Sequence, residues 1–162
     1  MALTNKYRNI IVDNLTGRKK SSETGYLGAA QIYIGLSSTA PTADGGNVTE
    51  PSSLTADGKS TGYGRTLIGK GGEAATYKFP AAASGEATNA EYIYFPEALA
   101  TWGDTLRYFV LFDAATGGNV VAYAKLMKDG KEEPINVTNP NTVVLFRPGD
   151  LTIKYVDALE LQ

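Results

Sequence analysis

The residues of this sequence that could do chemistry are carboxylates, lysines, tyrosines and hydroxyls, because its 162 positions include no His and no Cys. Without imidazole or thiol there is no Ser-His-Asp triad, cysteine nucleophile, histidine general base, disulfide or zinc site of the usual type. A carboxylate pair would still suffice for glycoside hydrolysis. The candidates are Glu91, Glu97, Asp104 and Asp113. No local pattern marks any of them, so we expect a protein that is not an enzyme and has no catalytic residues.

Two segments approach ligand-binding motifs without completing them. Residues 64–71 have the glycines and the lysine of a P-loop, but Gly71 stands where a Ser or Thr would hold Mg²⁺. Residues 72–80 then favour a turn and a short strand, whereas a P-loop needs a helix whose N-terminus faces the phosphates. Residues 44–47 with Glu50 lack the spacing of a calcium loop and predict a turn. We therefore expect no cofactor and no metal ion.

Aromatic side chains could instead contact a ligand. Trp102 follows a stretch of small residues and precedes a glycine, which favours a plug at one end of the core. The alternative is an exposed platform for sugar rings, formed by Trp102 with Tyr63, Tyr92 and Tyr94. Exposure of these rings decides between the two interpretations.

The charge balance indicates neither nucleic acid nor membrane as a partner. The formal net charge is −2, and the only basic run is 18–20. The first residues lack the apolar core of a signal peptide, and no apolar stretch approaches the roughly 20 residues that span a bilayer. We expect synthesis in a cytoplasm. The length predicts a single domain, 1–162, large enough to bury a core.

Residues 1–17 predict a short N-terminal helix. Thr4 is a candidate N-cap and Gly17 a candidate stop, which places the helix at about Asn5 to Thr16. Its apolar positions recur at helical spacing: Leu3, Tyr7, Ile10, Ile11 and Leu15. Polar residues occupy the opposite face: Lys6, Arg8, Asn9 and Asp13. Such a helix is marginal alone, so its apolar stripe must pack on its own body or on a partner subunit.

Residues 30–157 predict an antiparallel β-sandwich, jelly-roll-like or Ig-like, of about seven or eight strands. The first strand-like run is 31–36. The runs that give the count of seven or eight follow the polar stretch, at 65–68, 75–79, 91–95, 106–112, 120–127, 135–137, 142–146 and 151–156. The run 106–112 is apolar on both faces, which suits a central strand. Turn residues predict hairpins at 113–119, at 128–131 and at 148–150. Such local pairing argues against a parallel sheet with helices between its strands.

A long polar loop, 40–65, interrupts the β pattern. It offers only Val48 and Leu54 as apolar anchors. Loops of this length are usually functional or mobile, so we expect a projecting loop that contacts a partner or a neighbouring subunit, with a solvated excursion as the alternative. The candidate interface therefore comprises Leu3, Tyr7, Ile10, Ile11, Leu15, Val48, Leu54 and Tyr63.

A series of short motifs in fixed order resembles a family of small tailed-bacteriophage virion proteins, often labelled tail-fibre proteins. The motifs are Ala2–Asn5, Tyr33–Leu36, Thr39–Pro41, Gly62–Arg65, Asn89, Phe95-Pro96, Trp102-Gly103, Phe112–Asn119 and Gly149–Ile153. The resemblance implies a structural component of the virion, either a tail fibre or adaptor piece or a decoration protein on the capsid. It implies no catalytic residues.

Function would then lie in interfaces with other virion proteins and with copies of the chain. Symmetric assembly is the default for such parts, and we expect a homo-oligomer with threefold or higher symmetry, a trimer being favoured. The alternative function is a module on the virion surface that binds a carbohydrate or host receptor, with a host glycan as its ligand.

Overall fold

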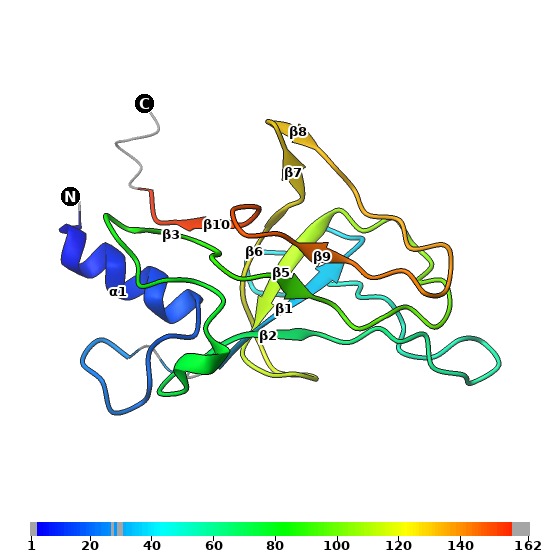
Figure 1. Cartoon of the computed structure of the whole chain (residues 1–162), viewed down its shortest axis with the longest axis horizontal. Helices are drawn as coiled ribbons and strands as arrows, with labels where there is room; N and C mark the ends of the chain where they lie inside the picture. The colour runs from blue at the N-terminus through cyan, green and yellow to red at the C-terminus, as the bar shows by residue number, and fades with distance from the viewer. Residues whose placement is uncertain (1–2, 27, 29–30, 157–162) are drawn as a thin grey trace. The chain divides into compact units, whose positions relative to one another are not determined.

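The chain is mainly β, with one α-helix and antiparallel strands among the described residues (Figure 1). The computed structural model describes residues 3–26, 28 and 31–156. Positions 1–2, 27, 29–30 and 157–162 of the predicted domain lie outside the described residues. The predicted class, antiparallel and sandwich-like with a short N-terminal helix, is confirmed.

The elements follow one another as α1 (Asn5–Leu15), β1 (Gln31–Ser37), β2 (Thr66–Lys70), the 3₁₀ turn η1 (Ala74–Thr76), β3 (Glu86–Thr88), β4 (Ile93–Tyr94), β5 (Tyr108–Phe112), β6 (Val120–Lys125), β7 (Met127–Lys128), β8 (Lys131–Glu132), β9 (Leu145–Phe146) and β10 (Thr152–Lys154). The largest sheet has four strands in the order β2-β1-β5-β6. Three two-stranded sheets pair β10 with β3, β4 with β9 and β7 with β8.

The chain forms two compact units, each assembled from separate segments. Unit 1 comprises 1–32, 67–93 and 146–162, and unit 2 comprises 33–66 and 94–145. Because neither unit is one continuous stretch, each needs distant parts of the sequence for its core. The single domain 1–162 and the body 30–157 stay predictions.

Helix α1 belongs to unit 1 and has the predicted bounds to within a residue. Thr4 has the extended backbone of an N-cap, and Gly17 has φ +72° at the stop. Val12 is fully buried. Asn9 Oδ1 accepts the Gly85 N–H at 2.6 Å, and Asp13 Oδ1 accepts the Ala82 N–H at 2.8 Å.

This packing turns part of the polar face of α1 toward the rest of unit 1. Asn9 and Asp13, expected opposite the apolar stripe, satisfy backbone donors of the turn before β3. The stripe is less covered: Tyr7 is 57% exposed, and Leu3, Ile10, Ile11 and Leu15 are half-buried. The backbone N–H groups of Ala82 and Gly85 need acceptors, and the side-chain oxygens of Asp13 and Asn9 supply them. These two hydrogen bonds explain why the polar face of α1 contacts the turn before β3.

Asn89 organises the other end of unit 1. Its side chain is 2% exposed and accepts the Leu151 N–H at 2.9 Å while donating to Arg147 O at 2.8 Å and to Glu91 O at 2.9 Å. Its backbone also receives the Gly149 N–H at 2.8 Å. Asn89, the residue that follows β3, therefore binds both ends of the loop between β9 and β10.

This arrangement corrects the predicted hairpin at 148–150. The two runs beside that turn do not pair with each other, because β9 pairs with β4 and β10 pairs with β3. The physical reason is that Asn89 inserts between the two strands and takes the hydrogen bonds that a hairpin would have used.

The predicted strand at 75–79 is also wrong. Residues 74–76 form η1, in which the Thr76 N–H and the Thr76 hydroxyl both donate to Glu73 O. The Thr76 hydroxyl in turn accepts the Lys70 N–H at 2.8 Å. Local bonds of a threonine side chain have replaced strand pairing. The run 135–137 keeps only an isolated bridge between Ile135 and Leu106.

The core of unit 2 lies along β5, which pairs with β1 on one side and β6 on the other, as its apolar sequence predicts. Val110, Leu111 and Phe112 are buried. The predicted hairpins at 113–119 and 128–131 are confirmed by the pairs β5–β6 and β7–β8. Asp129 and Gly130 have φ +50° and +75°, the conformation of a tight primed turn.

Candidate functional site

The long loop 40–65 of unit 2 is anchored to the sheet by Arg65. The Arg65 guanidinium binds both carboxylate oxygens of Glu50, with Nη2 at 2.6 Å from Oε2 and Nε at 3.0 Å from Oε1. Its Nη1 donates to Ala114 O at 2.9 Å and to Gly117 O at 2.7 Å. The Arg65 side chain is only 9% exposed, so these bonds form away from most of the solvent.

The same guanidinium covers the ring of Phe112, whose centroid lies 3.3 Å from the guanidinium carbon. The turn that begins at Phe112 is closed by Asp113, which accepts the Asn119 backbone N–H at 2.7 Å and its side-chain amide at 2.8 Å. These bonds lower the pKa of Asp113. Arg65 thus joins the motifs 62–65 and 112–119.

Tyr63 completes this cluster from the inside. Its hydroxyl donates to Glu50 Oε1 at 2.7 Å and accepts the Leu36 N–H at 3.0 Å. Burial, and then the negative charge of Glu50, raise the pKa of Tyr63 far above its ordinary value. We call Glu50, Tyr63, Arg65 and Phe112 the Arg65 clamp.

Only glycine fits beside the clamp in β1. A Cβ at Gly35 would lie 2.7 Å from Glu50 Oε1, 2.9 Å from the Phe112 ring and 3.0 Å from the Tyr63 hydroxyl. The third residue of the motif 33–36 is therefore required for packing rather than for a turn. Sequence reasoning missed the clamp because it considered Glu50 only as a calcium ligand. The signal that could have indicated the clamp was Arg65, the one arginine of the polar loop 40–65.

Trp102 is buried, as the core-plug interpretation predicted. It is 4% exposed and donates its indole N–H to Thr61 O at 3.1 Å. The Tyr63 ring packs edge-on against it, with centroids 5.2 Å apart. Trp102 therefore offers no open ring face and Tyr63 is half-buried, whereas Tyr92 and Tyr94 are 43% and 52% exposed.

Residues 52–61 of the loop form an ordered hairpin, which we call the arm. The Thr61 N–H donates to Ser53 O at 3.0 Å, Leu54 bridges to Ser60, and the Thr55 N–H donates to Lys59 O at 2.7 Å. Residues 56–60 are all exposed, and Leu54 is 54% exposed. The sequence predicted a projecting loop, and in the structure hydroxyl and backbone hydrogen bonds pair its second half.

The first half of the loop closes on itself. The Thr42 N–H donates to Gly46 O at 2.9 Å, and Asp44 accepts the Gly46 N–H, which confirms the predicted turn at 44–47. Val48 is half-buried. Within the described residues, no group of three or more Asp or Glu side chains is placed to hold a metal ion.

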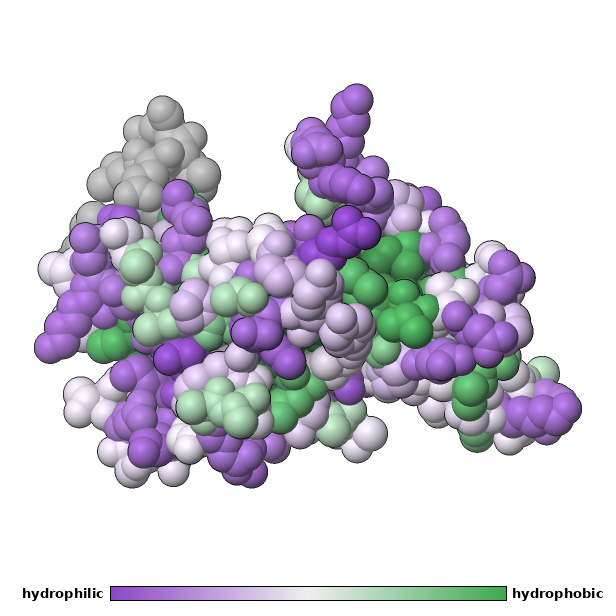
Figure 2. All heavy atoms as spheres, viewed as in Figure 1, coloured by the Kyte–Doolittle hydropathy of each residue, from purple (hydrophilic) through white to green (hydrophobic). Residues whose placement is uncertain are grey.

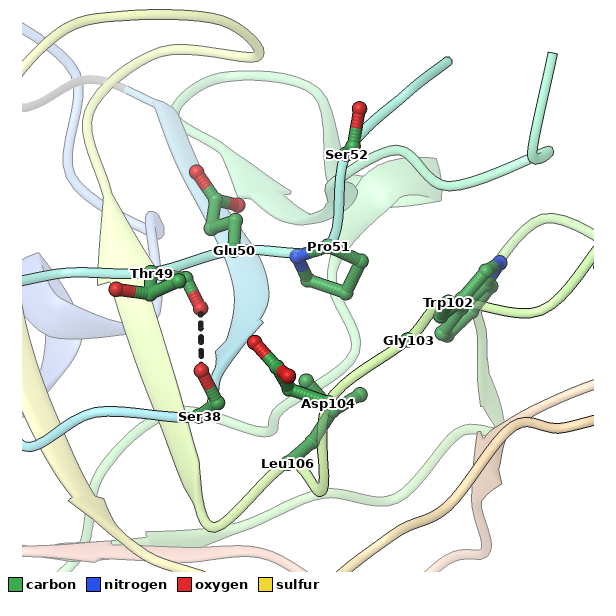
Figure 3. Close-up of a pocket in the computed structure, with 9 residues that line it drawn as sticks. All are labelled: Ser38, Thr49, Glu50, Pro51, Ser52, Trp102, Gly103, Asp104 and Leu106. Carbon is green, nitrogen blue, oxygen red and sulfur yellow. Dashed lines mark hydrogen bonds between the residues drawn. The ribbon is translucent and has the colours of Figure 1, made fainter. Parts of the chain in front are cut away.

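A pocket of about 340 Å³ opens beside residues 49–52, where the chain enters the arm (Figure 3). Its lining is Ser38, Thr49, Glu50, Pro51, Ser52, Trp102, Gly103, Asp104 and Leu106. Figure 3 shows the Asp104 carboxylate directed toward Ser38 and Thr49, with Glu50 pointing to the other side of the chain. Glu50 is held by Arg65, whereas Asp104 has no hydrogen bond or ion pair with the described residues.

Within the described residues, the other candidate carboxylates are not brought together in one site. Asp113 is used inside its own turn, and Glu91 and Glu97 are exposed and belong to different units. No helix in the part of the chain that the structure describes is long and apolar enough to cross a membrane.

Comparison with known proteins identifies a class of phage structural protein. Over residues 2–154 the chain matches the family described as podophage GP4 fiber I protein gp80. Because the match spans almost the whole sequence, the chain belongs to this family of phage fibre structural proteins, as its motifs predicted. A search of curated proteins found no match.

Proposed function

We propose that this fibre-family protein acts through subunit interfaces on the virion, with the arm as one contact. The observation that carries the proposal is the position of Leu54, a large apolar side chain 54% exposed on a paired hairpin. An apolar side chain held in water by an ordered arm loses little further entropy when a neighbour covers it. The Arg65 clamp fixes the base of the arm.

Other exposed apolar side chains of unit 2 support an interface function. Leu99, Val143 and Leu145 are 58%, 43% and 37% exposed. The backbone joins the segments that carry them, since the Ala98 N–H donates to Thr142 O at 2.9 Å. Figure 2 shows apolar surface over the segments beside β9. Contiguous apolar surface of this kind marks contact sites on many proteins.

The partners in this proposal are other virion proteins and copies of the chain. We favour a homo-oligomer with threefold symmetry, the tail fibre as location, and the apolar stripe of α1 as a second contact. A place on the capsid is the alternative location. Synthesis in the bacterial cytoplasm precedes assembly in this proposal.

Incorporation into particles tests the arm. A phage lacking its own copy is complemented with Leu54→Asp, and Ala56→Asp serves as a matched control on the same exposed arm. We expect Leu54→Asp to fold normally and to reduce the copies per purified particle by tenfold or more, about the effect of 1.4 kcal/mol. Normal incorporation of Leu54→Asp would contradict a role for the arm.

A second candidate function, saccharide binding, is favoured by the pocket below the arm. Among the described residues Asp104 has no hydrogen-bond or ion-pair partner, and its carboxylate is directed toward Ser38 and Thr49 (Figure 3). Sugar hydroxyls donate well to such an acceptor. Binding of the purified protein to a glycan array, abolished by Asp104→Ala, would favour this function. Glycan-array binding that persists in Asp104→Ala would show that this pocket is not the saccharide-binding site.

A further inference from the structure

One edge of the four-stranded sheet has no backbone partner among the described residues. The order β2-β1-β5-β6 leaves β2 and β6 as its two edge strands. The outer side of β2 is covered, because the Lys78 N–H donates to Ile68 O at 2.9 Å and the Lys70 N–H donates to Thr76 Oγ1 at 2.8 Å. Within the described residues, no backbone hydrogen bond reaches the outer side of β6.

Strand β6 carries little protection against pairing. Its residues are Val-Val-Ala-Tyr-Ala-Lys, with no proline and no charge before Lys125. Lys125 forms an ion pair with Glu132. The irregularity in register between Leu111 and Phe112 affects only the start of β6. Natural edge strands are usually blunted by lysines, prolines or bulges. In β6 the lysine and the irregularity lie at the two ends, so its central residues are the ones suited to pairing.

We propose that β6 pairs antiparallel with β6 of a second copy of the chain, across a two-fold axis at Tyr123. The inference rests on the proposed function, because it names one of the subunit contacts. A second copy has the same covered β2 edge, so β6 is the edge of this sheet that it can offer. A two-fold axis perpendicular to an antiparallel pair places one residue opposite its own copy.

An axis at Tyr123 gives the best side-chain pairing. The two Tyr123 rings, each 41% exposed, face each other and cover apolar surface, and aromatic cross-strand pairs are favourable. Lys125 then lies opposite Val121, next to Asn119 and its bound Asp113. In this register Lys125 keeps its ion pair with Glu132 and Asp113 keeps its hydrogen bonds to Asn119, so neither charge has to be left unpaired when the second copy binds.

Such a pair would extend the sheet without using the arm or α1. A two-fold contact at β6 can coexist with threefold contacts elsewhere on the surface, since closed assemblies combine both kinds of axis. Main-chain bonds would supply affinity, and the side chains on the two faces would set the register.

Cysteine cross-linking of the purified full chain tests the proposal, because the sequence contains no native cysteine. Under mild oxidation we expect Tyr123→Cys to form a covalent dimer, because the two sulfurs face each other across the axis. Tyr94→Cys, at a residue 52% exposed in the same unit, is the matched control and should stay monomeric on denaturing gels. Equal cross-linking of both variants, or none at Tyr123→Cys, would overturn the proposal.

A second measurement uses charge at the axis. Tyr123→Lys places like charges opposite each other and should raise the dissociation constant of the two-fold contact at least tenfold in analytical ultracentrifugation, whereas Tyr123→Phe should leave it unchanged. An oligomer unaffected by Tyr123→Lys would refute the β6 contact while leaving the proposed function intact. Dimers that form through β6 but never enter particles would instead contradict the proposed function.

Discussion

The guanidinium carbon of Arg65 lies 3.3 Å from the centroid of the Phe112 ring, and the same group holds both oxygens of Glu50. This contact connects the end of the long loop to the hairpin between β5 and β6. A fork-shaped, permanently charged group can satisfy a carboxylate, two carbonyls and a ring face at once, which lysine cannot do. The clamp therefore makes arginine specifically necessary at this position.

Replacing Arg65 by lysine should destabilise the protein. Arg65→Lys keeps the charge but loses the bidentate pair and leaves carbonyls unpaired, so we expect a loss of about 1–3 kcal/mol in the free energy of unfolding. Urea denaturation measures this loss. Arg107→Lys, at an exposed arginine of the same unit, should stay within about 0.5 kcal/mol of wild type. Equal losses of unfolding free energy in the two variants would show that the clamp does not stabilise the fold.

Tyr63 should make the fold sensitive to alkaline pH. Burial raises the pKa of Tyr63 above its ordinary value of 10.0, so above that pH the unfolded chain binds fewer protons than the folded chain. Stability is fully present below pH 10 and falls as the pH rises, by up to about 1.4 kcal/mol per unit for this group. Tyr63→Phe should lower stability at neutral pH and flatten the alkaline slope of the unfolding free energy. An unchanged slope in the variant would contradict the assignment.

Gly35 should tolerate no side chain. The added Cβ of Gly35→Ala would press on Glu50, Tyr63 and Phe112, and overpacking of this kind typically costs about 1–3 kcal/mol. Gly64→Ala is the control, because its Cβ would meet nothing closer than 3.7 Å. The thermal unfolding midpoints of the two variants should differ by several degrees; coincident midpoints would show that β1 can move away from the clamp.

Asn89→Ala should weaken unit 1. The substitution removes three buried or part-buried side-chain bonds and leaves the Leu151 N–H without its acceptor. We expect a loss of about 2–4 kcal/mol by chemical denaturation, because unpaired buried backbone groups are costly. Asn136→Ala loses only an exposed bond from Thr105 and should change stability little. A small effect at Asn89 would mean that water replaces its side chain.

Much of the local structure was predictable because it depends on neighbouring residues. Helix α1 followed from its apolar period and its glycine stop, and the hairpins at 113–119 and 128–131 followed from their glycines. The hairpin at 148–150 was wrong because Asn89, nearly sixty residues away, takes its hydrogen bonds. Strand partners depend on residues distant in sequence, and turn signals do not report them.

The candidate site divides in the same way. The sequence by itself determined that no histidine or cysteine chemistry is available, that a polar loop interrupts a β protein, and that the motifs follow the order of a phage fibre family. Only the tertiary structure decided that Arg65 anchors the loop and that Asn9 and Asp13 dock the helix. It also decided that Trp102 is buried and that β6 is an edge strand of the sheet. Composition and local periodicity act within a few residues, whereas burial and pairing depend on which distant groups the fold brings within a few ångströms.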